Sequence, residues 1–235
     1  MTVKFMTYNI QHGNRFHHDV IDLDMVANTI RSFDPDIAVM NEVRDGGDNP
    51  GYFHQTERVA KLLGWPYYYF ARAITFPDGG DYGNAILSKV PFKSVKNIKI
   101  PDPPVKDEDT YYETRCLIKA EFDGFAVLGT HMGLARAESR NAVATVLANT
   151  GSEPTILMGD FNLEPDDPIL QPVFGVYTDT ATMLKDKTLK SHPSDAPRIK
   201  IDYIFAKGVK KIIGADIPQI VTSDHCPHLA EIEIS

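Results

Sequence analysis

The sequence contains little of what secreted and membrane proteins use for stability or anchoring. It has two cysteines, Cys116 and Cys226, which are too few and too isolated for a disulfide framework or a thiolate metal site. No run of eighteen apolar residues predicts a membrane span, and no basic and apolar leader precedes the strand-like residues 3–6. We therefore expect a cytoplasmic protein with no transmembrane segment and with reduced thiols.

Positive charge is also scarce. The chain has 24 Lys and Arg against 32 Asp and Glu, a net charge of −8. A protein that binds nucleic acid generally presents a basic stripe to the phosphates. The nearest approach to one is two sparse clusters, Lys185, Lys187 and Lys190, and Lys207, Lys210 and Lys211. The charge argues against a general nucleic-acid binder and is compatible with a cleft whose carboxylates hold a cation.

What the sequence does contain is the composition of an ordinary globular protein. Apolar residues make up 43% of the chain and charged residues 24%. A length of 235 residues suits one domain or a tightly fused pair, and we expect a single domain over residues 1–235. We also expect a monomer.

Hydrophobic periodicity predicts an α/β protein. Three amphipathic stretches, residues 22–33, 56–63 and 136–149, have the spacing of helices. Asp123-Gly124 predicts a tight hairpin between two of the strands. Strands are predicted at residues 3–10, 37–40, 67–70, 84–87, 115–122, 125–130, 155–158, 201–205, 217–221 and 229–234. Such mixed strand pairs favour two central sheets packed face to face with helices outside, rather than one all-parallel sheet.

Polar residues suited to metal or phosphate chemistry recur at the ends of the apolar strands. Each of them alone could simply cap a strand on the surface. Strand ends in α/β folds converge on one rim, where ligands bind. Together, these polar residues therefore indicate a site on that rim. The residues are Asn9, Glu42, His131, Asp160, Asn162, Asp202, Asp224 and His225.

Phosphate ester hydrolysis explains these residue types. A hard cation such as Mg²⁺ prefers carboxylate and amide oxygens, which makes Glu42 the best ligand candidate, with Asn9 and Asp224 near it. A carboxylate beside an amide, as in Asp160 and Asn162, can orient and deprotonate a nucleophilic water.

Two histidines complete this chemistry, His131 and His225. A histidine close to the phosphorus can stabilise charge or protonate the leaving oxygen. A carboxylate behind the ring would orient it and raise its pKa, and Asp202 suits that role.

The motifs around these residues resemble the endonuclease/exonuclease/phosphatase superfamily, which includes deoxyribonuclease I, exonuclease III, inositol polyphosphate 5-phosphatases and neutral sphingomyelinases. Gly-Asp-Phe-Asn and Ser-Asp-His, in this order and spacing, are the most specific. The motifs run in the family's order through Thr7-Tyr8-Asn9-Ile10, Asn41-Glu42-Val43, Tyr82-Gly83-Asn84-Ala85-Ile86-Leu87-Ser88, Thr130-His131-Met132, Gly159-Asp160-Phe161-Asn162, Ile201-Asp202-Tyr203-Ile204-Phe205 and Ser223-Asp224-His225.

The resemblance implies a four-layered α/β sandwich, with two mixed sheets face to face and the site at one end of them. It implies Mg²⁺, with Mn²⁺ as an alternative, bound mainly by Glu42 with Asn9 and Asp224 in or next to the coordination shell. Asp160 and Asn162 would position the water and the phosphate.

The same resemblance assigns the substrate contacts. His131, and His225 backed by Asp202, would contact the phosphate. Arg115 would either neutralise the phosphate or form a surface ion pair, and both interpretations stay open. Tyr82 and Asn84 would line the rim.

Three further features bear on the interpretation. The family's usual Gln-Glu pair is Asn41-Glu42 here, which keeps the carboxylate but shortens its neighbour. His131 fits the nuclease, sphingomyelinase and 5-phosphatase branches better than exonuclease III-type enzymes. The loop after Asn9 is rich in histidine, including His12, and we interpret it as a solvated loop near the rim rather than a transition-metal site.

The leading hypothesis is a metal-dependent hydrolase of phosphodiesters or phosphomonoesters. Its substrate is left open, with a small-molecule or lipid-derived phosphate ester favoured over duplex DNA because basic residues are sparse. The alternatives are a DNA or RNA endo- or exonuclease, a catalytically inactive family member that acts as a binding module, and a structural α/β protein with accidental motif matches.

Overall fold

The computed structural model describes residues 1–235. The chain has four α-helices and fourteen strands. Strands and helices alternate in the first part of the chain, and strands follow one another in the middle. The elements are β1 (Thr2–Asn9), β2 (Asn14–Arg15), β3 (Val20–Ile21), α1 (Leu23–Phe33), β4 (Ile37–Asp45), α2 (Gln55–Leu63), β5 (Tyr67–Thr75), β6 (Asp81–Ser88), β7 (Ser94–Lys99), β8 (Cys116–Glu121), β9 (Ala126–His131), α3 (Arg136–Asn149), β10 (Thr155–Asp160), α4 (Gln171–Phe174), β11 (Thr178–Asp179), β12 (Asp202–Lys207), β13 (Lys211–Asp216) and β14 (His228–Glu233).

Two six-stranded sheets form the centre of the molecule. The first has the strand order β13-β14-β1-β4-β6-β5 and the second β11-β12-β10-β9-β8-β7. Only β1 with β4 and β9 with β10 pair in parallel, and the other neighbours are antiparallel. Both sheets are therefore mixed, as the sequence predicts.

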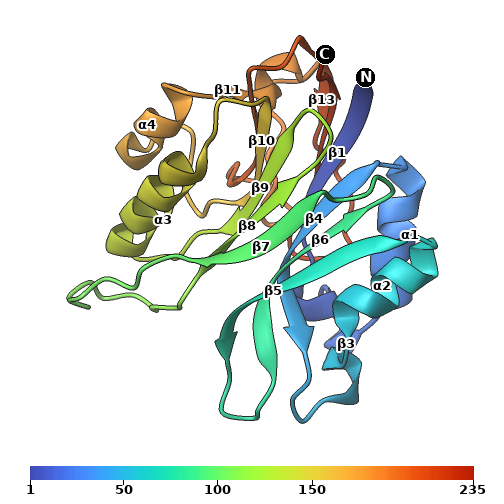
Figure 1. Cartoon of the computed structure of the whole chain (residues 1–235). Coiled ribbons are helices and arrows are strands. Elements are labelled where there is room, and N and C mark those ends of the chain that lie inside the picture. Colours follow the sequence, from blue (N-terminus) through green and yellow to red (C-terminus); the bar gives the residue numbers. More distant parts are fainter.

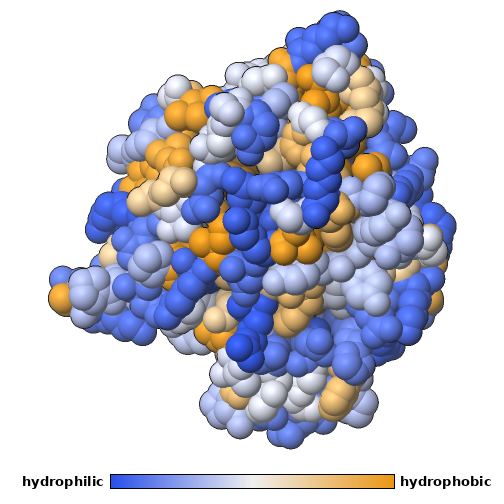
Figure 2. All heavy atoms as spheres, viewed as in Figure 1, coloured by the Kyte–Doolittle hydropathy of each residue, from blue (hydrophilic) through white to orange (hydrophobic).

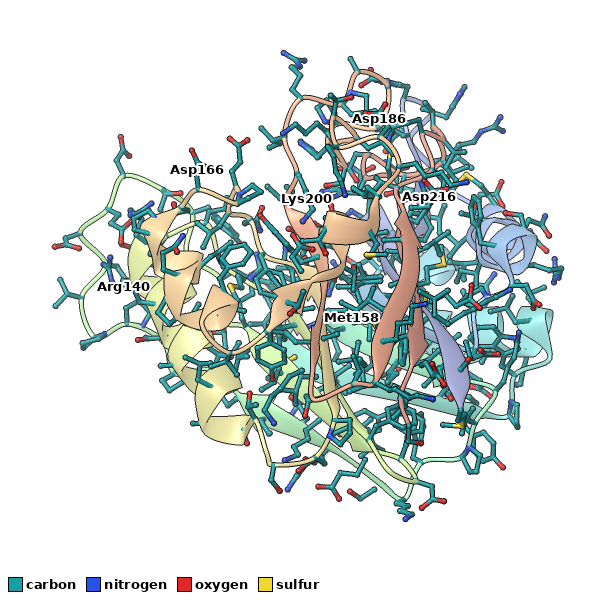
Figure 3. The ribbon with its side chains drawn as sticks, turned by 90° about the horizontal axis from the view of Figure 1, so that it is seen from above. Arg140, Met158, Asp166, Asp186, Lys200 and Asp216 are labelled. Atoms are coloured by element: carbon teal, nitrogen blue, oxygen red, sulfur yellow. The ribbon has the colours of Figure 1, made fainter.

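Three apolar cores separate the layers. Phe5, Ile37 and Ile86 of the first sheet pack against Ile118 and Met158 of the second in a shared core. Figure 3, seen from above, places Met158 at the centre of the molecule. Helices α1 and α2 cover the outer face of the first sheet, and α3 and α4 cover that of the second (Figure 1). The predicted four-layered sandwich is confirmed.

The parallel pairs bring the chemically active strand ends to one edge. The register of β1 and β4 places Asn9 opposite Asn41. In the second sheet Asp160 lies opposite His131 on β9 and opposite Asp202 on β12. The expected convergence of strand ends on one rim is therefore seen in both sheets.

The strand predicted at residues 217–221 does not form, and this prediction is wrong. Those residues are irregular, and the strand is β13, which ends at Asp216. Pro218 lacks the N–H that a sheet needs, which breaks the strand despite its apolar neighbours. The buried Ile217 instead joins a small core with Leu184 and Cys226.

β7 is also a strand that the hydrophobic pattern misses. Of its residues only Val95 and Ile98 are partly buried, each against a different core, and the other four are exposed. It lies at the edge of the second sheet, where charged side chains block pairing with another chain. Its apolar content is therefore too low for a hydrophobic run to reveal it.

The surface is mostly hydrophilic on the face drawn in Figure 2, where hydrophobic residues are scattered rather than gathered into one broad patch. None of the helices has both the length and the apolar character needed to cross a membrane.

The first prediction concerns Gly159, where the neighbouring strand leaves no room for a side chain. Its φ is +149°, and a Cβ added there would stand 1.8 Å from the carbonyl oxygen of Thr130 on the neighbouring strand. Gly159→Ala should therefore destabilise the fold by about 3 kcal/mol or more and lower the melting temperature by roughly 6–12 °C.

Gly214→Ala is the matched control, because a Cβ at Gly214 would meet no atom within 4 Å. That variant should unfold within a degree or two of the wild type. Equal melting temperatures for the two variants, measured by calorimetry, would show that β9 and β10 tolerate a side chain at Gly159.

Candidate active site

Asn41 is buried beneath the site and connects the two sheets. Its buried amide nitrogen donates to the Oδ1 of Asn84 at 2.9 Å and to the carbonyl oxygen of Thr130 at 3.0 Å. Its Oδ1 accepts from the backbone N–H of Asp160 at 3.0 Å. One amide therefore holds together β4 and β6 of one sheet and the ends of β9 and β10 of the other.

Asn9 links the carboxylates that the two sheets supply. Its Nδ2 donates to Oε1 of Glu42 at 3.0 Å and to Oδ2 of Asp160 at 3.1 Å. Its Oδ1 accepts from the backbone N–H of Gln11 at 3.1 Å. In this arrangement Asn9 orients both carboxylates, and its own oxygen is already engaged by the backbone.

Glu42 enters the cleft from an irregularity in β4. The pairing of β4 with β6 shifts register between Met40 and Val43, and Glu42 has φ 57°. A left-handed conformation is costly for a residue with a Cβ and is concentrated at functional sites. The bulge re-aims one side chain without ending the strand, so β4 runs on past Glu42 to Asp45.

Two histidines converge on one oxygen of Asp160. The Nε2 of His131 lies 3.5 Å from Asp160 Oδ2, and the Nε2 of His225 lies 3.7 Å from the same atom. Oδ1 of Asp160 accepts from the backbone N–H of Asn162. Burial raises the pKa of Asp160 to about 7, although His225 acts to lower it. A carboxyl that changes charge near neutrality is suited to exchanging a proton with water.

His225 and Asp202 form the pair that the sequence predicts. The Nδ1 of His225 lies 2.8 Å from Oδ2 of Asp202, although 22 residues separate them along the chain. Burial alone would lower the pKa of His225, but Asp202 and Asp160 outweigh it and raise the pKa to about 10. His225 is therefore a cation at neutral pH.

His131 has the opposite electrostatic environment. Burial lowers its pKa well below the usual range, and Arg115 and His225 lower it further. The Nη1 of Arg115 lies 3.1 Å from its Nδ1, and the Nδ2 of Asn162 lies 3.1 Å from its Nε2. His131 is therefore neutral at physiological pH, close beside a charged histidine.

A cleft of 470 Å³ at one end of the paired sheets is lined by Glu42, Asp160 and the two histidines. One wall includes Arg44, whose guanidinium lies 4.5 Å from the ring centre of Tyr52 and 4.6 Å from that of Phe76. The turn after β5 and the segment after β4 protrude together beyond the sheets (Figure 1), and Arg44 is joined to Asp78 in that turn. The lining residues are His12, Glu42, Arg44, Phe76, Tyr82, Tyr111, Glu113, Arg115, His131, Leu134, Asp160, Asn162, His192, Asp224 and His225.

Three of the predicted site residues do not line this cleft. Asn9 and Asp202 lie beneath it and hold the side chains that do. Asn84 is buried, accepts from Asn41, and donates to the carbonyl oxygen of Cys116 at 3.3 Å. The structure therefore places Asn84 behind the site as a link between the sheets, where the resemblance implied a rim residue.

Arg115 and Tyr82 do lie in the cleft wall. Arg115 is buried and donates to Oε1 of Glu113 at 2.8 Å. Its ion pair is therefore an internal one, which differs from the surface pair that the sequence left open.

Sequence reasoning missed seven of the cleft residues, and the basic ones among them are His192, Arg44 and His12. His192 comes from a long polar loop, and its ring centre lies 4.6 Å from that of His225. Arg44 is two positions beyond Glu42 on the same strand, a spacing that could have revealed it. His12, interpreted as part of a solvated loop, has its Nδ1 3.6 Å from Glu42 Oε2.

The donor set fits a hard cation. Glu42 lines the cleft, with Oε1 bound by Asn9 and Oε2 lying 3.6 Å from the Nδ1 of His12. Asp224 has Oδ1 bound by the hydroxyl of Ser223, and its carboxylate also lines the cleft. Carboxylate oxygens of this kind, with room for several waters, suit Mg²⁺ or Mn²⁺ better than a thiolate-binding metal.

The sequence matches the profile of the Endonuclease/Exonuclease/phosphatase family over residues 6–225. The chain belongs to this family. The predicted resemblance is thus confirmed, and the family's members are phosphoesterase hydrolases. A search of curated proteins by sequence gave no match.

Solved structures of family members have the same fold. A protein from Beutenbergia cavernae described as endonuclease/exonuclease/phosphatase is 21% identical, with a TM-score of 0.81 over 100% of this chain and 72% of that one. A mannosyl-6-phosphatase of Bacteroides thetaiotaomicron is 17% identical, with a TM-score of 0.76 over 98% and 99% of the two chains. The human Nocturnin catalytic domain is 16% identical, with a TM-score of 0.73 over 100% and 94%.

The His225–Asp202 pair gives the second prediction. If His225 acts as a cation, activity is lost as the pH rises through its pKa, because the deprotonated ring is neutral. Asp202→Asn removes the charge that raises this pKa, so the basic limb of the kcat/KM profile should move down by about 1–3 pH units. The profile should be recorded on bis-p-nitrophenyl phosphate.

Asp123→Asn, in an exposed hairpin turn, is the matched control and should leave the limb in place. In His225→Ala, adding Asp202→Asn should cause little further loss, because residues that act as a unit are non-additive. Losses that simply multiply in the double variant would separate the roles of the two residues.

Proposed function

We propose that this protein is a divalent-cation-dependent hydrolase that attacks a small phosphate ester with water. The observation that carries the proposal is the convergence of Asp160, His131 and the charged His225 on one point, beside the carboxylate of Glu42. A base, a hydrogen-bond donor, a cation and a metal-binding carboxylate are what phosphoryl transfer to water needs in one place.

The residues have separate roles in this scheme. Asp160, held by Asn9 and the backbone N–H of Asn162, orients the attacking water and takes up its proton. His225, kept protonated by Asp202, stabilises charge on the phosphoryl oxygens and can protonate the leaving oxygen. His131 contacts the same phosphoryl group as a neutral ring.

Glu42 and Asp224 would hold the cation, with Asn9 keeping Glu42 in place. When bound, a divalent cation neutralises phosphoryl oxygens and polarises the phosphorus–oxygen bonds. We infer Mg²⁺, with Mn²⁺ as an alternative, because the donors are hard oxygens.

The charge distribution of the cleft supports a small substrate over duplex DNA. Its only permanent cations are Arg44 and Arg115, and each is paired with a carboxylate, Asp78 and Glu113. No lysine lines the cleft. A duplex would need several unpaired cations along its backbone, whereas one phosphate group needs only the cation and the two histidines. The name of the Bacteroides thetaiotaomicron neighbour indicates a sugar phosphate as one ester to test.

The third prediction is the outcome of a hydrolysis panel with Mg²⁺ or Mn²⁺. The panel comprises p-nitrophenyl phosphate, bis-p-nitrophenyl phosphate, mannose 6-phosphate, inositol phosphates, sphingomyelin and plasmid DNA. We expect turnover of at least one small ester, abolished by EDTA and lowered by about 10²–10⁴ in His225→Ala, with slow or no cleavage of plasmid DNA.

Turnover of plasmid DNA ahead of every small ester would favour the nuclease alternative. A folded protein that binds the cation and hydrolyses nothing in the panel would favour the binding module.

The fourth prediction concerns the cation itself. Glu42→Gln removes the charge but keeps the shape, so it should weaken Mg²⁺ binding in a calorimetric titration by at least about tenfold and lower turnover with it. Glu231→Gln on β14, a residue that forms no ion pair in the structure, is the matched control. Unchanged Mg²⁺ affinity in Glu42→Gln would remove Glu42 from the coordination shell.

A further inference from the structure

The hydrogen-bond partners of His131 constrain where its ring proton lies. Arg115 is buried against the ring, with Nη1 3.1 Å from Nδ1. A guanidinium has five N–H donors and no acceptor, and it does not lose its proton in proteins. Nδ1 can therefore make this contact only through its lone pair, which leaves the proton of the neutral ring on Nε2.

On the other side of the ring, Asn162 competes with Arg115 for the single acceptor nitrogen of a neutral imidazole. The Nδ2 of Asn162 donates to the carbonyl oxygen of Met132 at 2.9 Å and lies 3.1 Å from His131 Nε2. A neutral imidazole cannot accept at both nitrogens, so one of the two donors must give way. The guanidinium is charged and its hydrogen bond is the stronger, whereas Asn162 keeps its bond to Met132 in either case. The Nε2–H is then directed toward Asp160 Oδ2, 3.5 Å away.

We propose that Arg115 is a positioning residue that holds His131 as the Nε2–H tautomer, so that His131 donates a hydrogen bond to the substrate phosphate. Arg115 acts through the ring rather than as a phosphate ligand itself. Glu113 holds the guanidinium against the ring, because the same Nη1 donates to its Oε1 at 2.8 Å. The role in catalysis rests on the proposed function, whereas the tautomer does not.

This assignment explains how two histidines work side by side. The groups that face His131 are Arg115, Asp160, Asn162 and His225. Asp160 alone would favour a second imidazolium, but Arg115 and the charged His225 both oppose it. His225 has a carboxylate at Nδ1 and carries a charge, and His131 has a guanidinium at Nδ1 and does not. Both present an N–H to the same point without two cations repelling each other there.

The experiment is a long-range ¹H–¹⁵N correlation of the histidine rings in uniformly ¹⁵N-labelled protein, with His131 assigned by its loss in His131→Gln. In the wild type we expect an unprotonated Nδ1 and a protonated Nε2, with no change between about pH 5.5 and 8. Arg115→Met alone would leave Glu113 buried without its partner, so Glu113→Gln is added. In the double variant the ring should titrate or change tautomer.

Glu113→Gln alone keeps Arg115 and is the matched control, which should retain the wild-type ring spectrum. Arg115→Lys also supplies a donor and should restore the Nε2–H tautomer at least in part. On a small ester the double variant should lose about 10–100-fold in kcat with KM little changed. A ligand of the phosphate would instead raise KM.

A protonated Nδ1 in the wild type, or an unchanged ring spectrum in the double variant, would overturn the tautomer assignment. A large rise in KM with an unchanged ring would make Arg115 a phosphate ligand. If the wild type hydrolyses no ester of the panel, the proposed function fails, while the ring spectra still decide the tautomer.

Discussion

The whole site depends on the buried amide of Asn41, which hydrogen-bonds across the gap between the sheets. Glu42 belongs to the first sheet, and Asp160 and His131 belong to the second. The apolar core between the sheets is non-directional, so it would tolerate small sliding movements that a catalytic site could not. Two of its three hydrogen bonds, to the carbonyl oxygen of Thr130 and from the backbone N–H of Asp160, reach the second sheet, and their fixed directions set the register of one sheet on the other. This is the position where the family's usual glutamine is one carbon longer.

Sequence reasoning succeeds where a property repeats along the chain or is carried by a specific motif. Apolar periodicity predicts all three long helices nearly to the residue, and Asp22 is the N-cap of α1 through its bond to the N–H of Met25. The motifs predict that Asp202 meets His225. Long-range packing is what sequence reasoning cannot give. His192 reaches the cleft from an irregular loop, and no spacing relates it to the site. Nor does any local pattern show that Asn84 has its amide engaged between the sheets.

Burial alone does not decide the charge of a histidine in this site. His131 and His225 are both nearly fully buried, and both lie within 4 Å of Asp160 Oδ2. Desolvation pushes both rings toward the neutral form. The difference comes from the group at Nδ1, which is a carboxylate for one ring and a guanidinium for the other. Two identical side chains thereby acquire different charges within a few ångströms.

The place of β14 has a consequence for the order in which the protein assembles. β1 lies inside the first sheet between β4 and β14, and Thr2 pairs with Glu233 across nearly the whole chain. Such distant pairings close slowly, since a long loop must be ordered before the contact stabilises it. The segment just before β14 carries Asp224 and His225. A growing or partly unfolded chain therefore lacks the closed sheet and the charged histidine together, and the cleft is assembled only in a chain whose first sheet is complete.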